Sequence, residues 1–137
     1  MGRRLNEAVR DADMVLRWGG EEFLVYSQGV VAAQRALLVQ RILSAIAGAP
    51  MLLDDGSLVQ VSATAGAVSL PLANLPDFGW EQAIALADRA LYKGKEAGRN
   101  RGFIVDGVTP AQAAGDHRDL RLLLVLPDRQ WQPAHQA

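Results

Sequence analysis

The stretch that decides the fold is Arg17-Trp18-Gly19-Gly20-Glu21-Glu22-Phe23, which joins two short β-prone runs. The first run is Met14-Val-Leu-Arg-Trp, and the second is Phe23-Leu-Val-Tyr-Ser. A Gly-Gly pair between such runs predicts a β-hairpin, because a primed turn needs positive φ at both central positions and glycine adopts it without steric cost. We therefore expect Gly19 and Gly20 to form the turn.

The two carboxylates that follow the turn indicate metal and phosphate chemistry. The glycines leave the turn without side chains, so a phosphate group can approach the backbone closely. Glu21 and Glu22 come next, and carboxylate oxygens suit Mg²⁺, which commonly bridges a protein carboxylate and a substrate phosphate. The alternative is a plain hairpin with two solvated glutamates, since short motifs also occur by chance.

Three other segments show apolar residues at helical spacing. They are residues 3–11, residues 30–47, which Gly48 and Pro50 end, and residues 80–97, which Gly98 ends. The side chains expected to face inward are Leu5, Ala8 and Val9 in the first, Val31, Leu38, Ile42, Leu43 and Ile46 in the second, and Ala83, Ile84, Ala87 and Leu91 in the third.

The remaining β-prone runs complete the predicted order of elements. Met51-Leu-Leu is followed by a turn at Asp54-Asp-Gly and by the alternating run Leu58–Leu70, which predicts a half-buried strand paired back through that turn. Residues 102–105 form a short closing strand. The order of helix, hairpin, helix, hairpin, helix and strand predicts an α+β fold with helices packed on a sheet.

Composition excludes several classes of protein. The 137 residues are 50% apolar and 21% charged, with a net charge of −1, which is ordinary for one globular domain without affinity for nucleic acid or an anionic membrane surface. There are no cysteines, hence no disulfides or thiolate metal sites, as expected of a cytoplasmic protein. No apolar run is long enough to span a membrane.

Three motifs together resemble the GGDEF family. Gly19 to Phe23 is similar to its signature in the common GGEEF form, and Arg10-Asp11-Ala12-Asp13 is similar to its RxxD inhibitory motif just upstream. Ala87 to Asn100, with Asp88-Arg-Ala-Leu-Tyr-Lys-Gly-Lys-Glu-Ala-Gly-Arg in between, resembles the second hallmark of the family. The resemblance covers residues 1–107, which we interpret as a partial GGDEF domain.

The resemblance implies a diguanylate cyclase, a nucleotidyltransferase that condenses two GTP molecules into cyclic di-GMP with Mg²⁺ or Mn²⁺. The fold it implies is nucleotidyl cyclase-like, with a ferredoxin-like core and a mainly antiparallel sheet flanked by helices. Glu21 and Glu22 would then be the metal-binding and catalytic residues, and Gly19 and Gly20 would leave room for the nucleotide. Each domain holds one GTP, so the reaction requires a homodimer.

Two basic residues of the second hallmark would bind the triphosphate. Lys95 and Arg99 are four residues apart, which places them on one face of a helix. Taken alone, an exposed basic helix end that the helix dipole favours would be the preferred interpretation, but the match of Gly98-Arg99-Asn100 to the family hallmark favours phosphate binding.

The resemblance also implies a site for product inhibition. Arg10 and Asp13 would bind cyclic di-GMP, since arginine donates two parallel hydrogen bonds and aspartate accepts from guanine N–H groups. Arg41 lies where some members of the family have a further inhibitory-site arginine. The alternative for all three is a solvated surface residue.

In the family, the domain begins before the residue that is Met1 here. The resemblance therefore implies that the N-terminal third is missing, with its metal-binding aspartate and the asparagine and aspartate that bind guanine. We expect this chain by itself to be a weak or inactive cyclase, and an upstream sensor domain in the parent protein. The alternative function is an inactive GGDEF module that binds cyclic di-GMP as a receptor or acts as a dimerisation or regulatory element.

Residues 108–137 follow the resembling part as a linker and tail. The run 120–126, Leu-Arg-Leu-Leu-Leu-Val-Leu, is apolar enough for an extra buried strand that could fill the place of the missing first strand. The alternatives are an unstructured tail or the start of a further domain.

Overall fold

The computed structural model describes residues 2–70, 79–109, 112 and 120–127. The chain divides into two compact units, and each is described by itself: the first comprises the chain up to Ser62 together with Pro127, and the second spans Ala63–Leu126. The described residues form three helices and small, mostly antiparallel sheets. The α+β fold class is therefore confirmed.

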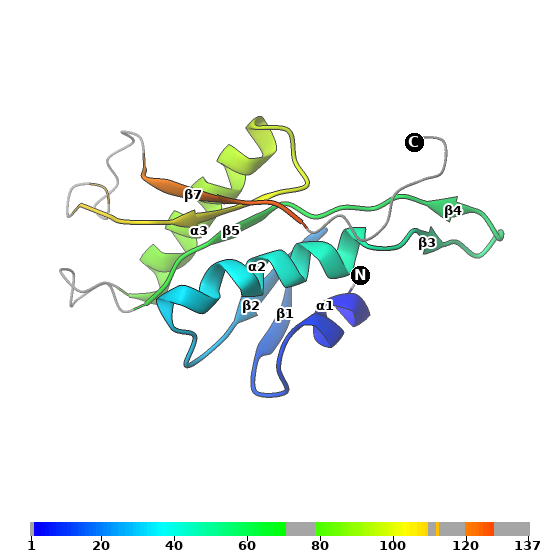
Figure 1. Cartoon of the computed structure of the whole chain (residues 1–137), viewed down its shortest axis with the longest axis horizontal. Helices are drawn as coiled ribbons and strands as arrows, with labels where there is room; N and C mark the ends of the chain where they lie inside the picture. Colours follow the sequence, from blue (N-terminus) through cyan, green and yellow to red (C-terminus); the bar gives the residue numbers. More distant parts are fainter. Residues whose placement is uncertain (1, 71–78, 110–111, 113–119, 128–137) are drawn as a thin grey trace. The chain divides into compact units, whose positions relative to one another are not determined.

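The first unit begins with helix α1 (Gly2–Ala8) and the hairpin of β1 (Met14–Gly19) and β2 (Glu22–Tyr26) (Figure 1). The hairpin is antiparallel, with Met14 opposite Tyr26 and Gly19 opposite Glu22. A register shift between Arg17 and Gly19 leaves one extra residue, Trp18, on β1, which is a β-bulge.

The turn of this hairpin differs from the expectation by one residue. Gly19 ends β1, so the two central residues are Gly20 and Glu21 rather than Gly19 and Gly20. Gly20 has φ +53°, whereas Gly19 and Glu21 are not among the described residues with positive φ. A positive φ at the first central position alone is the pattern of a type II′ turn, which needs one glycine instead of two.

Helix α2 (Ala32–Ala47) follows in the first unit and packs against α1. Its fully buried side chains are Leu43 and Ile46, as expected. Val39 is buried as well, whereas Val31 is 58% exposed, because the helix begins one residue after it. The unit ends with β3 (Met51–Leu52) paired antiparallel to β4 (Leu58–Val59) around the predicted Asp-Gly turn.

The long strand expected at Leu58–Leu70 was wrong, because the run divides between two sheets. Only β4 pairs back through the turn, and β5 (Ala65–Ala67) belongs to the second unit, where it pairs in parallel with β6 (Gly102–Val105). Alternating side chains favour a strand but do not specify which strand is its partner.

Helix α3 (Trp80–Glu96) covers the sheet of the second unit (Figure 1). It approaches β5 so closely that a Cβ on Gly66 would lie 2.0 Å from the Ala87 carbonyl oxygen and 2.5 Å from the Leu91 nitrogen. Its buried face comprises Ala83, Leu86, Ala90 and Gly94, and the expected Ile84, Ala87 and Leu91 are half-buried beside it.

The third strand of this sheet is β7 (Leu122–Val125), which pairs antiparallel with β6, with Val105 opposite Leu122. It lies within the apolar run 120–126, and Leu120 and Leu122 pack against a core cluster of Leu86, Ala90, Val105 and Val108. That this strand replaces a missing first strand stays a prediction. Among the described residues, no helix has the length and apolar character needed to cross a bilayer.

Candidate functional site

The hairpin turn presents two free carboxylates. Glu21 and Glu22 are both exposed, and neither side chain accepts a hydrogen bond or forms an ion pair with any described residue. No described group of three or more acidic or histidine side chains could hold a metal ion. Mg²⁺ usually keeps several waters and binds through one or two carboxylates plus substrate phosphates, so this pair fits as the protein's share of a magnesium site.

Arg17 holds the backbone of the same turn. Its Nε and Nη2 atoms donate to the carbonyl oxygen of Gly20, at 3.2 and 3.0 Å. The Gly20 carbonyl belongs to the central peptide of the turn, the one that leads into Glu21. The guanidinium group therefore fixes the orientation of this peptide by two charge-assisted hydrogen bonds to one oxygen.

The basic residues of the second hallmark lie in the other unit and do not share a helix face, so this part of the expectation was wrong. Lys95 lies in the last turn of α3, but the helix ends at Glu96 and Arg99 follows it with φ +63°. Gly98 and Asn100 also have positive φ, and the Arg99 N–H donates to the Gly94 carbonyl at 3.0 Å. The helix thus ends in a left-handed turn, which aims Arg99 independently of Lys95.

Arg10 and Asp13 are brought together, but they bind each other. The Arg10 Nη2 donates to Asp13 Oδ1 at 3.0 Å, and the Arg10 backbone N–H donates to Asp13 Oδ2 at 2.9 Å. The Asp13 side chain is 0% exposed, while that of Arg10 is 48% exposed and also donates to the Gln28 carbonyl at the end of the hairpin. The hydrogen bonds from Arg10 hold the pKa of Asp13 below its usual value of 3.8.

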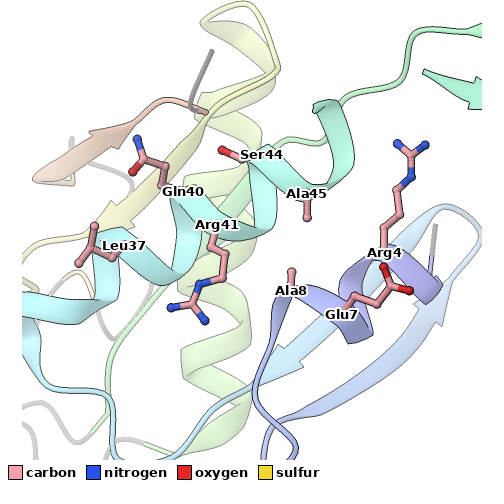
Figure 2. Close-up of a pocket in the computed structure, with 8 residues that line it drawn as sticks. All are labelled: Arg4, Glu7, Ala8, Leu37, Gln40, Arg41, Ser44 and Ala45. Carbon is pink, nitrogen blue, oxygen red and sulfur yellow. The ribbon is translucent and has the colours of Figure 1, made fainter. Parts of the chain in front are cut away.

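Arg41 lies elsewhere, at a shallow groove of about 430 Å³ between α1 and α2 (Figure 2). Ala8 and Ala45 face each other across the groove, and Glu7 lies at its rim. Arg41 is exposed and has no hydrogen-bond or ion-pair partner among the described residues. Arg10 and Asp13 are not among the described residues that line this groove.

Arg4 also lines the groove, but its side chain binds backbone carbonyls at and just after the end of α2, a structural role that the sequence analysis did not predict. Its guanidinium donates to the carbonyls of Ile46, Ala49 and Pro50, at 2.6, 2.8 and 3.0 Å. The last carbonyls of a helix have no partner within the helix, so Arg4 satisfies the end of α2 from α1. The signal in the sequence was the stop at Gly48 to Pro50, which exposes carbonyls that a basic side chain can bind.

Comparison with known proteins places this geometry in context. Residues 1–101 match the family model described as "Diguanylate cyclase, GGDEF domain". The chain is 38% identical over 106 residues to the uncharacterized protein YhcK of Bacillus subtilis, a match that covers 74% of the chain and 27% of the relative. It is 32% identical over 97 residues to the diguanylate cyclase DgcP of Pseudomonas aeruginosa, which covers 71% of the chain and 14% of the relative. It is also 32% identical over 104 residues to the response regulator PleD of Caulobacter vibrioides, which covers 71% of the chain and 21% of the relative.

A solved structure has the same fold. The diguanylate cyclase SiaD of Pseudomonas aeruginosa, crystallised in complex with its activator SiaC, superposes with a TM-score of 0.65 at 22% identity. The match covers 74% of this chain and 37% of that one. At this identity the likeness concerns the fold alone.

Proposed function

Because the chain belongs to the GGDEF family of diguanylate cyclase domains, we propose that its hairpin turn carries the metal-binding part of a site that condenses two GTP molecules into cyclic di-GMP. The observation that carries this proposal is the pair of free, exposed carboxylates at the hairpin turn: Glu21 is its second central residue, after Gly20 at positive φ, and Glu22 begins β2. Unpaired carboxylates at an open turn favour a cation that arrives with the nucleotide.

Glu21 and Glu22 hold Mg²⁺ or Mn²⁺ in this proposal. When bound, the ion neutralises phosphate charge and lowers the barrier to displacement at phosphorus. One glutamate binds the metal directly, and the other assists metal binding or accepts the proton of the attacking ribose 3′-hydroxyl. Carboxylates suit both tasks, because they are acceptors and act as general bases when they reach the proton.

Two other features of the chain support a nucleotide site. A Cβ on Gly19 or Gly20 would meet no atom of the described part of the chain within 4 Å, which leaves the space beside the turn open to a ligand. Lys95 and Arg99 are exposed and have no side-chain partner among the described residues, which leaves their charges available for a triphosphate. We propose that these four residues bind the substrate.

In the reaction, the 3′-oxygen of each GTP attacks the α-phosphate of the other in line, so that two phosphodiester bonds form and two pyrophosphates leave. Such a transfer depends mainly on positioning and charge stabilisation. One hairpin turn offers one such carboxylate pair, so two GTP molecules meet only when two domains face each other. We therefore propose a homodimer, in the cytoplasm where GTP is made, under the control of a sensor domain of the parent protein.

Arg10, Asp13 and Arg41 form the regulatory part of the proposal. Product binding at Arg10 and Asp13 requires their ion pair to open, because the Asp13 carboxylate is fully covered in the closed state. Arg41 would contribute from α2 as a separate contact. Cyclic di-GMP would then compete with the Arg10–Asp13 ion pair, so a higher product concentration would be needed for inhibition than if the two residues were unpaired.

The second candidate is a cyclic di-GMP receptor or dimerisation element without catalysis. It is favoured by the absence of a third metal ligand near Glu21 and Glu22 among the described residues. Incubation of the chain with GTP and Mg²⁺, followed by mass spectrometric detection of cyclic di-GMP, distinguishes the two. Slow product formation that a Glu22→Gln variant abolishes supports the cyclase. Product formation that is unchanged in this variant contradicts it, and cyclic di-GMP binding without any product supports the receptor.

A further inference from the structure

Arg17 stands out among the residues near the hairpin turn because its side chain bonds only to backbone. Two of its N–H groups converge on the Gly20 carbonyl, and it has no other side-chain partner among the described residues. The residue is exposed, so these bonds do not serve a hydrophobic core. The Gly20 carbonyl belongs to the peptide that leads into Glu21, one of the two residues to which the proposed function assigns the metal.

The peptide that Arg17 holds is the one that can flip. The primed turns I′ and II′ differ chiefly in the orientation of their central peptide, and type I′ requires positive φ at both central residues. Here the central residues are Gly20 and Glu21, and only Gly20 has positive φ. A flip would force Glu21 into the left-handed region, which disfavours residues with a Cβ.

Strand geometry places the guanidinium where it can act on this peptide. Arg17 pairs with Phe23, while Gly19 pairs with Glu22, and the bulge residue Trp18 lies between the two pairs. A bulge increases the local twist and redirects the neighbouring side chains. Arg17 thereby reaches forward over the turn, to the carbonyl three residues ahead.

We propose that Arg17 is a positioning residue for the metal site: by holding the Gly20 carbonyl, it fixes the central peptide of the turn and with it the direction of the Glu21 and Glu22 side chains. This inference rests on the proposed metal role of the two glutamates. Arg17 itself touches neither metal nor substrate in this account.

The charge of Arg17 makes the proposal testable, because a charge effect and a positioning effect would change the affinity for metal in opposite directions. A guanidinium beside two carboxylates repels a cation, so if charge were its only influence, removing it would tighten metal binding. A positioning role predicts the opposite, because a turn free to flip presents the carboxylates in several directions. Arg17→Lys separates the two further, since lysine keeps the charge but loses the rigid fork that converges on one oxygen.

The experiment measures Mn²⁺ binding to the full chain by the paramagnetic broadening of the Glu21 and Glu22 backbone amides. We expect about fivefold weaker binding in both Arg17→Gln and Arg17→Lys, the loss typical of one net hydrogen bond within a protein. Arg3→Gln is the matched control, because the Arg3 side chain is 91% exposed and, among the residues that the structure describes, pairs only with Glu7. Affinity that is equal or tighter in both Arg17 variants overturns the proposal.

A metal-free measurement separates failure of this inference from failure of the proposed function. If the wild-type chain does not bind Mn²⁺ at the turn, the metal role of the glutamates is wrong. The amide signals of Gly20, Glu21 and Glu22 without metal then decide the role of Arg17. Shifted or multiple signals for these residues in Arg17→Gln support positioning of the turn, and signals identical to the wild type overturn it.

Discussion

Substitution of Gly66 by alanine tests how the second unit holds α3 in place. The new Cβ would lie 2.0 Å from the Ala87 oxygen, 2.5 Å from the Leu91 nitrogen and 3.0 Å from the Leu91 Cα, and all three are backbone atoms that no change of rotamer can move. Ordinary contact begins near 3.4 Å, so α3 must move away from β5 by roughly 1.4 Å.

The cost of this movement follows from what α3 buries. Leu86 and Ala90 are 2% and 0% exposed and belong to the core cluster of the unit. Overpacking of a well-packed core costs about 1–3 kcal/mol. A movement of α3 by roughly 1.4 Å would also remove about a quarter to a half, or more, of the dispersion energy between α3 and β5. We therefore expect Gly66→Ala to lower the free energy of unfolding by about 3 kcal/mol or more. This is a large share of the ~5–15 kcal/mol by which domains are stable.

Urea unfolding followed by circular dichroism measures this loss. Gly94→Ala is the matched control at the same interface, because its Cβ would meet the Thr64 Cγ2 at 2.7 Å, a side-chain atom that can rotate away. Alanine also gains about 1 kcal/mol over glycine within a helix, so this control should be close to neutral. Equal unfolding midpoints for the Gly66→Ala and Gly94→Ala variants would refute the reasoning.

Three further predictions concern the first unit. Arg4→Ala should cost about 1–3 kcal/mol in urea unfolding, because it removes the partner of the Ile46 carbonyl in the last turn of α2 and of the Ala49 and Pro50 carbonyls just after it. Arg3→Ala should cost less than about 0.5 kcal/mol, and equal losses would argue against the helix-end role. Because the pKa of Asp13 is lowered in the folded chain, its carboxylate stabilises the fold above pH 3.8, and this contribution is lost as the pH falls through the folded-state pKa. The thermal unfolding temperature of Asp13→Asn should therefore depend less on pH below about 4 than that of the wild type. An unchanged pH dependence would contradict this. Gly19→Ala should leave the free energy of unfolding within about 1 kcal/mol of the wild type, because the new Cβ meets no described atom within 4 Å. The same variant should bind GTP more weakly in a titration, and unchanged GTP affinity would show that the nucleotide does not use this space.

Local pattern predicted most elements of this fold. The hairpin, the ends of α2 and α3 and the strand at residues 102–105 all follow from periodicity and from glycine or proline at their boundaries. Burial was less predictable. In α2, Val39 is buried although the sequence analysis did not place it among the inward-facing residues. Val31 was expected to face inward, but the helix begins at Ala32, so Val31 lies outside it and is exposed.

The parts that could not be predicted depend on partners distant in sequence. The run Leu58–Leu70 alternates throughout, but its first part pairs with β3, whereas its later part pairs with β6, which follows α3 in the chain. Arg99 looked helical by its spacing from Lys95, yet three successive positive φ angles take it out of the helix. Arg10 and Asp13 are only three residues apart, but Arg10 also donates to the Gln28 carbonyl, 18 residues further along the chain, and no local pattern specifies that contact.

The proposed function depends on binding of metal and nucleotide at the turn that carries Glu21 and Glu22. The decisive experiment is a titration of the chain with GTP in the presence of Mg²⁺, followed by the backbone amides of Gly20, Glu21 and Glu22. We predict saturable shifts at these three residues that disappear in the Glu21→Gln/Glu22→Gln double variant. Shifts that are absent from the wild type, or that persist unchanged in the double variant, would contradict the claim.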